Sequence, residues 1–165
     1  MILRYLAVFG PATAQDMQAW CGLTRLREVV ERLRPQLRTF RDEHGRELFD
    51  LPNAPLPDPD TPAPPRFLPE YDNVVLSHAD RGRIVTEERR RSWDMTRIGW
   101  GAVLVDGFAR AAWKISRQGG TATLLIEPQE RLAAQHRAEV AEEGARLLAF
   151  AAAGQAHDIR ISAPT

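Results

Sequence analysis

Histidine and cysteine are the side chains that most often hold metals or attack substrates, and this chain has few of them. Its four histidines and one cysteine are widely separated: His44, His78, His136, His157 and Cys21. None pairs with another at a metal-ligand spacing, and one cysteine cannot form an internal disulfide. A glycine-rich phosphate loop and a nucleophile elbow are also missing. We therefore predict no metal and no cofactor, and residue types alone assign no catalytic residue.

His78 has the most polar surroundings of the four histidines. Nearby residues could form a polar cluster with it: Asp72, Asn73, Asp80 and Arg81. Asp and Asn side chains commonly hydrogen-bond the backbone in tight turns, which is a structural interpretation of this stretch. The other interpretation is a polar cluster that faces a nucleic-acid strand. Both stay open from the sequence.

Arginine supplies almost all of the positive charge. The 165 residues include 22 basic and 22 acidic side chains, and Lys114 is the only lysine. Guanidinium groups bind phosphates and base edges through two hydrogen bonds at once, which suits a nucleic-acid partner. The codon bias of a GC-rich genome explains the same preference. The zero net charge argues against a uniformly basic coat and against an acidic tail.

Three short helices are predicted near the N-terminus. They cover residues 2–9, about 14–20, and from Thr24 to about Arg34. Thr13 can cap the second helix because Asp16 follows it three residues later. We expect Met17 and Trp20 to be buried by this helix. Thr24 is the expected cap of the third helix, and the core-facing positions of that helix are Leu26, Val29, Val30 and Leu33.

A hairpin is predicted after the third helix. Residues 37–51 contain two β-prone runs around a polar tip, Asp42 to Gly45, where Gly45 can adopt a positive φ. Three helices and a hairpin indicate a winged helix-turn-helix, whose third helix enters the major groove while the hairpin lies along the backbone or a minor groove. The candidate DNA-binding residues are Thr24, Arg25, Arg32, Arg38, Arg41 and Arg46.

The charge of this first module is low for a DNA-binding domain. Residues 1–51 hold eight arginines and seven acidic residues, a net charge of +1. Phosphate neutralisation dominates DNA affinity, so this balance is unfavourable. Glu28 and Glu31 alternate with the arginines, and the face could instead be a salt-bridged solvent surface. A protein-interaction or regulatory module is therefore the alternative function.

A proline-rich segment separates two predicted domains. Seven of the 14 residues in 52–65 are proline. Proline prevents both helices and central strands, so we expect a semi-rigid linker between domain 1–51 and domain 66–165.

The second domain is predicted to combine strands with one long helix, which makes the whole chain α+β. Turns at Asp106-Gly107 and at 118–120 join strands into a β-meander, and residues 158–162 form a last strand. The helix is expected to start at Pro128, end near Ala153 and pack on the strands. Its expected stripe is Leu132, His136, Val140, Leu147 and Phe150. The charged run 87–91 is expected to be an exposed loop or a helix end.

Several segments, in order, resemble one family of DNA-repair proteins. They are residues 4–11, 18–23, 37–40, 67–73 and 76–81. Together they resemble the winged-helix DNA-binding domain-containing proteins of the bacterial AlkZ/YcaQ-type DNA glycosylase superfamily. The resemblance implies tandem winged helices and a β-rich domain around DNA, in proteins that excise alkylated bases and unhook interstrand crosslinks. Such excision generally requires that the damaged nucleotide leave the base stack.

The chain departs from this family in its length and in one motif. Family members are typically much longer, and a catalytic Gln-hydrophobic-Gln (or Asp) motif lies in their N-terminal part. Neither Gln15 with Gln18 nor Gln129 with Gln135 matches that motif. The chain thus resembles the C-terminal half of a member, either as a truncated reading frame or as a free-standing relative. We expect a DNA-binding module without glycosylase activity, or alternatively a glycosylase whose catalytic residues are unidentified.

Double-stranded DNA is the expected partner, with an upstream domain or a second copy of the chain as further possibilities. No apolar run approaches the roughly 18 residues that a membrane span needs. The N-terminus also lacks a signal-peptide pattern. We therefore expect a cytoplasmic protein that does not associate with membranes.

Overall fold

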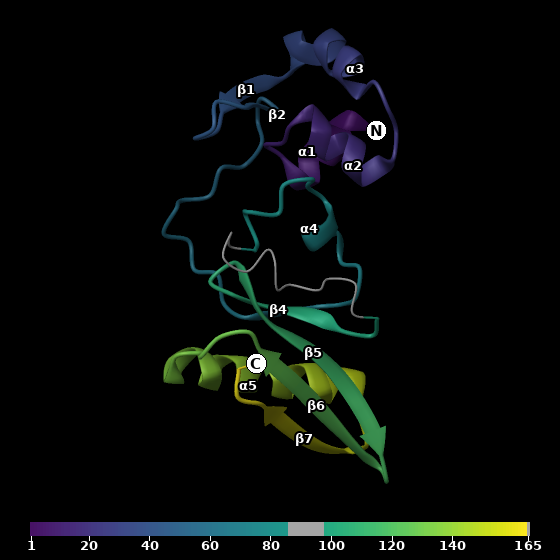
Figure 1. Cartoon of the computed structure of the whole chain (residues 1–165), viewed down its shortest axis with the longest axis vertical. Coiled ribbons are helices and arrows are strands. Elements are labelled where there is room, and N and C mark those ends of the chain that lie inside the picture. Colours follow the sequence, from purple (N-terminus) through teal and green to yellow (C-terminus); the bar gives the residue numbers. More distant parts are fainter. Residues whose placement is uncertain (86–97, 165) are drawn as a thin grey trace. The chain divides into compact units, whose positions relative to one another are not determined.

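The computed structural model describes residues 1–85 and 98–164, and Figure 1 shows its elements in chain order. The charged run 87–91 lies outside the described residues. Within the described part, no helix is both long and apolar enough to cross a membrane. Helices and strands combine in this chain, which therefore has the α+β class that the sequence predicts.

Two compact units make up the chain. The first contains Met1–Thr61 and Asn73–Arg81, and the second contains Pro62–Asp72 and Gly82–Thr165. The chain thus passes from one unit to the other at three points. The prediction that 66–165 form one domain differs from this division, because residues 73–81 group with the N-terminal helices. Their hydrogen bonds to those helices, described below, are the physical reason.

The first unit begins with three helices: α1 (Ile2–Phe9), α2 (Ala14–Cys21) and α3 (Leu26–Leu33). A 3-10 turn, η1 (Arg34–Gln36), leads to the antiparallel strands β1 (Arg38–Arg41) and β2 (Glu47–Asp50). A further short helix, α4 (Asn73–Leu76), also belongs to this unit. The three helices and the hairpin lie close to their predicted positions.

The caps of α2 follow the sequence, while the start of α3 does not. The Thr13 hydroxyl accepts a hydrogen bond from the Asp16 amide at 3.1 Å, and the Asp16 carboxylate accepts one from the Thr13 amide at 2.8 Å. This reciprocal capping box confirms the predicted start of α2. The Thr24 cap is wrong, because Arg25 is the residue before α3. Arg25 has a left-handed backbone conformation with φ 60°. No side chain caps the start of α3.

The connection between α1 and α2 pairs with the hairpin. The Ala12 amide donates to the Phe49 carbonyl at 3.0 Å, and the Phe49 amide donates back to the Ala12 carbonyl at 2.8 Å. Gly10 permits this approach, since a Cβ there would collide with the Asp50 carboxylate and the Leu6 carbonyl. The second strand of the hairpin is therefore joined directly to the helices.

The core of the first unit forms between these elements. Its buried members are Ile2, Tyr5, Leu6, Ala12, Met17, Leu26, Val30 and Phe49. Trp20 was expected inside but is 37% exposed, because it lies on the last turn of a helix of only eight residues. Val29 is 41% exposed, also against expectation. Leu26 and Val30, one turn apart, occupy the core side of α3 and leave Val29 at its margin.

The second unit is built on a five-stranded sheet. Its strands, in spatial order, are β3 (Arg66–Leu68), β4 (Gly101–Val105), β5 (Phe108–Gln118), β6 (Thr121–Pro128) and β7 (Ala156–Ile161). Neighbouring strands are antiparallel except for β6 and β7, which are parallel. Asp106 and Gly107 have φ of 51° and 78° at the β4–β5 turn, as the sequence predicts for a tight hairpin.

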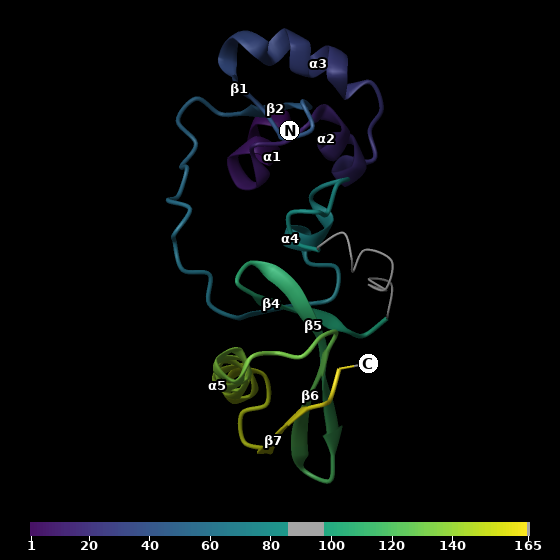
Figure 2. The ribbon, with the colours of Figure 1, turned by 60° about the vertical axis from the view of Figure 1, so that its left-hand side comes forward.

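Helix α5 (Ala134–Ala151) connects β6 to β7 and packs on the sheet (Figure 2). The buried residues of this core are Val103, Val105, Ala111, Ala122, Leu124, Ile126, Val140, Leu148 and Ala152. The predicted start at Pro128 is wrong, because Pro128 still pairs with Ala111 as the last residue of β6. The predicted position of Phe150 in the stripe is also wrong, since that side chain is 89% exposed.

Glycine explains the error in the predicted stripe of α5. The buried positions of this helix are Val140, Gly144 and Leu148, spaced by four residues. Gly144 contributes no apolar side chain, so a search for hydrophobic residues shifts the stripe toward Phe150. A Cβ on Gly144 would lie 2.7 Å from the Leu124 side chain, so the bare helix backbone packs directly against β6.

We predict that Gly144→Val destabilises the second unit by about 1–3 kcal/mol, because a branched side chain overpacks the space filled by Leu124. The control is Ala145→Val, at an exposed position of the same helix, which should change stability by less than about 1 kcal/mol. Urea unfolding followed by circular dichroism measures both values. Equal effects of the two variants would contradict the close contact.

Candidate nucleic-acid interface

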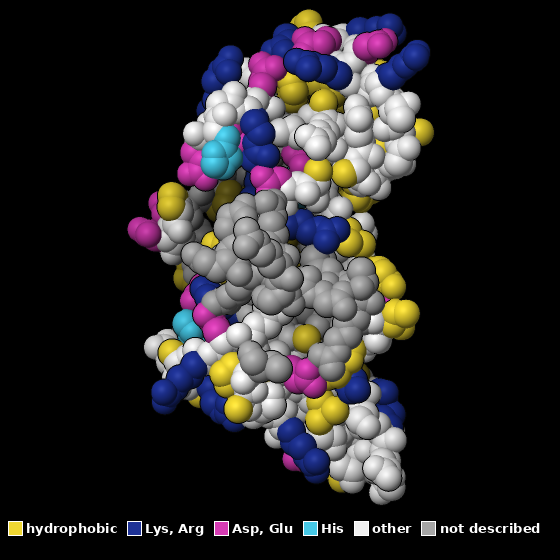
Figure 3. Space-filling model, viewed as in Figure 1, with side chains coloured by type: hydrophobic (Ala, Val, Ile, Leu, Met, Phe, Trp, Pro, Cys, Tyr) yellow, Lys and Arg dark blue, Asp and Glu magenta, His cyan; other side chains and the backbone are white. Residues whose placement is uncertain are grey.

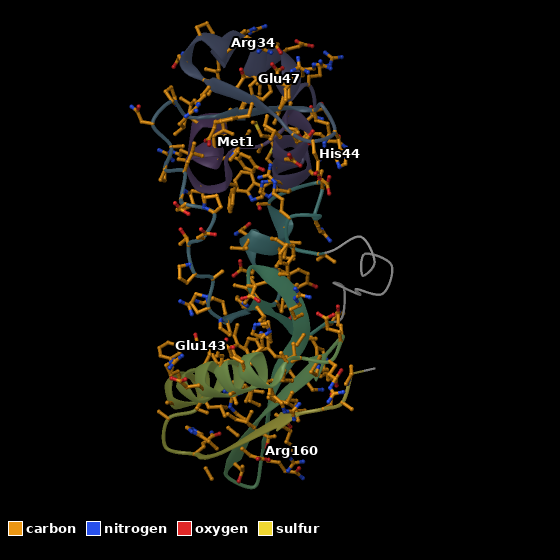
Figure 4. The ribbon with its side chains drawn as sticks, turned by 90° about the vertical axis from the view of Figure 1, so that its left-hand side faces the viewer. Met1, Arg34, His44, Glu47, Glu143 and Arg160 are labelled. Carbon is orange, nitrogen blue, oxygen red and sulfur yellow. The ribbon has the colours of Figure 1, made fainter. Side chains whose placement is uncertain are left out.

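Arg34 fastens the end of α3 to the hairpin. Its guanidinium group donates to the Glu31 carboxylate at 2.7 and 2.8 Å and to the Glu47 carboxylate at 2.8 Å twice. Arg34 and Glu47 are labelled side by side in Figure 4. The same guanidinium lies 5.3 Å from the centre of the Phe49 ring. Two bidentate pairs of this kind fix geometry as well as charge, so the root of the hairpin is held to α3.

These contacts change the ionisation of all three groups. Hydrogen bonds from Arg34 are the main reason why the pKa of Glu31 and the pKa of Glu47 lie below their usual value of 4.5. The same hydrogen bonds raise the pKa of Arg34. At neutral pH the set holds two negative charges and one positive charge, and Arg34 is already engaged.

Asp42 organises the tip of the hairpin. One carboxylate oxygen accepts hydrogen bonds from the amides of His44 at 2.9 Å and Arg46 at 2.8 Å, and the other accepts from Arg46 Nε at 2.6 Å. Arg41 donates to the Gly45 carbonyl at 3.1 Å, and Gly45 has φ 75°. The tip at 42–45 therefore lies where the sequence predicts it. Burial raises the pKa of Asp42, but the hydrogen bonds from Arg46 and His44 outweigh it and lower this pKa.

Residues 73–81 pack against α1 and α2. The hydroxyl of the buried Tyr5 donates to the Ser77 carbonyl at 2.6 Å. The Trp20 indole, in the last turn of α2, donates to the Asn73 side-chain oxygen at 3.1 Å. Both contacts join positions more than 50 residues apart. No local sequence pattern indicates them.

His78 takes part in the same packing. Its Nε2 lies 3.1 Å from the Phe9 carbonyl, and its Nδ1 lies 2.8 Å from the Ser77 hydroxyl. A carbonyl oxygen only accepts, so Nε2 carries a proton and donates to Phe9, while Nδ1 shares a hydrogen bond with the Ser77 hydroxyl. The hydrogen-bonding capacity of the imidazole is thus used inside the first unit.

The structure divides the predicted polar cluster. Asn73, His78, Asp80 and Arg81 belong to the first unit, whereas Asp72 belongs to the second. Asp80 forms an ion pair with Arg46 at 2.8 Å, and its backbone approaches the Asp16 carboxylate. The side chains of Asn73, His78 and Asp80 therefore all contribute to holding residues 73–81 on the helices and the hairpin.

The candidate DNA-binding residues fall into two groups. Thr24, Arg25, Arg32, Arg38 and Arg41 are exposed. Arg46 is also exposed but is paired with Asp42 and Asp80. The guanidinium of Arg38 lies over the Phe40 ring, 4.7 Å from its centre. Arg27 is also exposed on α3.

Ion pairing and burial remove most of the acidic residues of 1–51 from the exposed, unpaired surface. Glu31 and Glu47 pair with Arg34, and Asp42 pairs with Arg46. Two others are buried: Asp16 at 5% exposure and Asp50 at 1%. The exposed acidic residues outside these arginine pairs are Glu28 and Glu43.

Most arginines of the same segment stay outside ion pairs. Within the described parts of the chain, six exposed arginines have no carboxylate partner: Arg4, Arg25, Arg27, Arg32, Arg38 and Arg41. Figure 3 shows basic side chains gathered over α3 and the hairpin, with acidic ones between them. The exposed, unpaired charge is therefore more positive than the net charge of +1 suggests.

No metal centre accompanies this surface in the part of the chain that the structure describes. Within it, no three His, Cys, Asp or Glu side chains are grouped so that they could hold an ion.

The family of the chain follows from comparison with known proteins. A sequence model described as DNA glycosylase AlkZ-like matches residues 1–150. The chain belongs to the AlkZ-like DNA glycosylase family, which confirms the resemblance seen in its sequence. A similar solved structure is that of the Streptomyces sahachiroi DNA glycosylase AlkZ, with a TM-score of 0.71 and 23% identity over 98% of this chain. The match covers 44% of that protein, so this chain spans less than half of its length. No curated protein matches the sequence.

We predict that Tyr5→Phe lowers the free energy of unfolding by about 1 kcal/mol, because the Ser77 carbonyl loses a buried hydrogen bond while the ring remains. Tyr71→Phe is the matched control, since Tyr71 is 65% exposed. Chemical denaturation of both variants measures the difference. A Tyr5→Phe protein as stable as the control would show that this contact does not hold residues 73–81.

The Arg34 pairs also predict a pH dependence. Because the pKa values of Glu31 and Glu47 are lowered in the folded state, their stabilisation is present above the usual value of 4.5 and is lost as pH falls through the lower folded values. Arg34→Gln should therefore lower the melting temperature most at neutral pH, and less at about pH 3.

The measurement is the melting temperature across this pH range. Arg160→Gln is the control, since it removes an exposed arginine from the Arg160–Asp158 pair of the second unit. A difference between wild type and Arg34→Gln that stays constant at all pH values would contradict the assigned coupling.

Proposed function

We propose that the first unit is a winged helix-turn-helix that binds double-stranded DNA through α3 and the hairpin of β1 and β2. Membership in a family of DNA glycosylases supports a DNA partner. The order of elements supports the fold name, as does the Ala12–Phe49 pairing that joins the hairpin to the helices. In the second unit, we propose that β4, β5 and β6 form the predicted β-meander, and that residues 52–65 act as a linker.

The observation that carries this proposal is the set of exposed, unpaired arginines. Two of them, Arg27 and Arg32, lie on α3, and Arg25 directly precedes this helix. The strand β1 adds Arg38 and Arg41. Phosphate neutralisation by such groups supplies most of the affinity of non-specific DNA binding. The ion pairs of Arg34 and Arg46 support this surface by engaging nearby carboxylates that would otherwise repel phosphates.

Val29 gives α3 a second kind of contact. This exposed side chain lies one turn after Arg25 and three residues before Arg32 on the helix. An apolar group on a helix in the major groove can contact the methyl group of thymine. We infer that the arginines contact the backbone while Val29 faces base edges.

We further propose that this chain binds DNA and does not itself excise bases. The glutamine motif that characterises catalysis in the resembled family has no counterpart among its residues. Incubation with an alkylated duplex, followed by cleavage at abasic sites, tests this part. Strand breaks above the buffer control would show that unidentified residues of this chain catalyse excision.

DNA binding is tested with a fluorescent duplex of about 20 base pairs at roughly 50 and 200 mM salt. We predict that Arg25→Ala and Arg32→Ala weaken binding and each reduce the slope of log affinity against log salt by about 1. Arg146→Ala is the control, because Arg146 is exposed on α5 but paired with Glu142 and Glu143.

Two results would contradict the proposal. Wild-type protein that does not bind the duplex at the lower salt concentration would favour a protein-interaction or regulatory module. Binding with unchanged salt slopes in both variants would show that DNA contacts a different surface.

A further inference from the structure

An ion pair connects the hairpin tip to a residue outside the helices and hairpin of the first 51 residues. Arg46 uses Nε on Asp42 at 2.6 Å and Nη1 on Asp80 at 2.8 Å. Hydrogen bonds to Asp42 and Asp80 raise the pKa of Arg46, so its positive charge is retained across the normal pH range. One guanidinium therefore bridges the turn of the hairpin and residues 73–81.

The backbone of residues 79 and 80 is held at the start of α2. The Ala79 amide donates to the Asp16 carboxylate at 2.9 Å, and the Asp80 amide approaches the same oxygen at 3.5 Å. Asp16 is 5% exposed and is itself held by its hydrogen bonds with Thr13. The backbone of Asp80 is thus held at the start of α2, while its carboxylate binds Arg46.

The hairpin consequently has a second attachment by side chains. Arg34 and Glu47 hold its root to α3, while Arg46 and Asp80 hold its tip. An isolated two-stranded hairpin has little stability of its own in water. The second attachment restricts the angle at which β1 and β2 project from the helices.

We propose that Asp80 is a positioning residue for DNA binding, which fixes the hairpin tip through Arg46 so that hairpin and α3 contact one duplex together. This inference rests on the proposed function of the first unit. Residues 73–81 would then support DNA binding indirectly, although the carboxylate of Asp80 itself repels phosphate. Asp80 acts through Arg46 and does not touch DNA.

The sign of one substitution separates this proposal from simple electrostatics. Asp80→Asn removes a negative charge and releases a hydrogen-bonding arm of Arg46. Electrostatics alone therefore predicts tighter DNA binding. A positioning role predicts weaker binding, because the hairpin loses its attachment and must be ordered when DNA binds.

The experiment uses the full chain and the same fluorescent duplex. Asp80→Asn should weaken binding by about fivefold, the scale expected when an exposed ion pair is lost. Asp80→Glu, which keeps the carboxylate, should bind more tightly than Asp80→Asn. Asp158→Asn is the control, since it removes one charge and breaks the Arg160–Asp158 pair.

Hydrogen exchange without DNA supplies an independent readout. The amides of His44 and Arg46 are bound to Asp42, so Asp80→Asn should accelerate their exchange while the amides of α5 keep theirs. Circular dichroism confirms that each variant is folded.

Several outcomes overturn the inference. The inference is wrong if Asp80→Asn binds the duplex as tightly as wild type or more tightly. It is also wrong if hydrogen exchange at the His44 and Arg46 amides is unchanged in this variant. If wild-type protein fails to bind the duplex, the proposed function fails, and the exchange data alone then show whether Asp80 holds the hairpin.

Discussion

The first unit depends on one buried carboxylate, that of Asp16. Asp16 caps the start of α2 through reciprocal hydrogen bonds with Thr13. Its carboxylate also accepts hydrogen bonds from the amides of Ala79 and Asp80. Burying such a group is costly unless hydrogen bonds satisfy it, so loss of these donors destabilises the first unit. Local helix formation and the return of the chain from the second unit are therefore stabilised by the same side chain.

Charge pairing extends this arrangement to the surface. Arg34 and Arg46 each bind two carboxylates, which gives the hairpin its orientation. The same pairs remove acidic groups from the surface of α3 and the hairpin. Among the eight arginines and seven acidic residues of 1–51, most of the acidic groups are paired or buried, while most of the arginines are exposed and unpaired within the described residues. Net charge is a poor guide to the partner of such a chain.

Local signals predicted the elements well where the responsible interaction is itself local. The Thr13–Asp16 cap of α2 and the positive φ values at Asp106 and Gly107 lie within a few residues of the features that encode them. The predicted start of α5 is wrong because Pro128, which is favourable as a first helical residue, is the last residue of β6. Gly144 was overlooked because a search for apolar side chains cannot register a helix that packs through its bare backbone.

The candidate site was less predictable than the fold. The arginines of α3 and the hairpin could be named from the sequence, and so could the polar residues around His78. The partner of Arg46, by contrast, is 34 positions away in Asp80, and the partner of Tyr5 is 72 positions away in Ser77. Such pairs exist only after the chain has left the first unit, formed β3 and come back. No spacing rule can relate them.

The path of the chain has a consequence for its integrity. Residues 73–81 belong to the first unit, yet the proline-rich segment 52–65 and β3 precede them in the sequence. A protease that cuts the backbone once between residues 52 and 61 would therefore not release the N-terminal helices. The larger fragment would still carry Ser77, His78 and Ala79, bound to Tyr5, Phe9 and Asp16. A nicked molecule would keep both fragments in one noncovalent complex until the first unit unfolds.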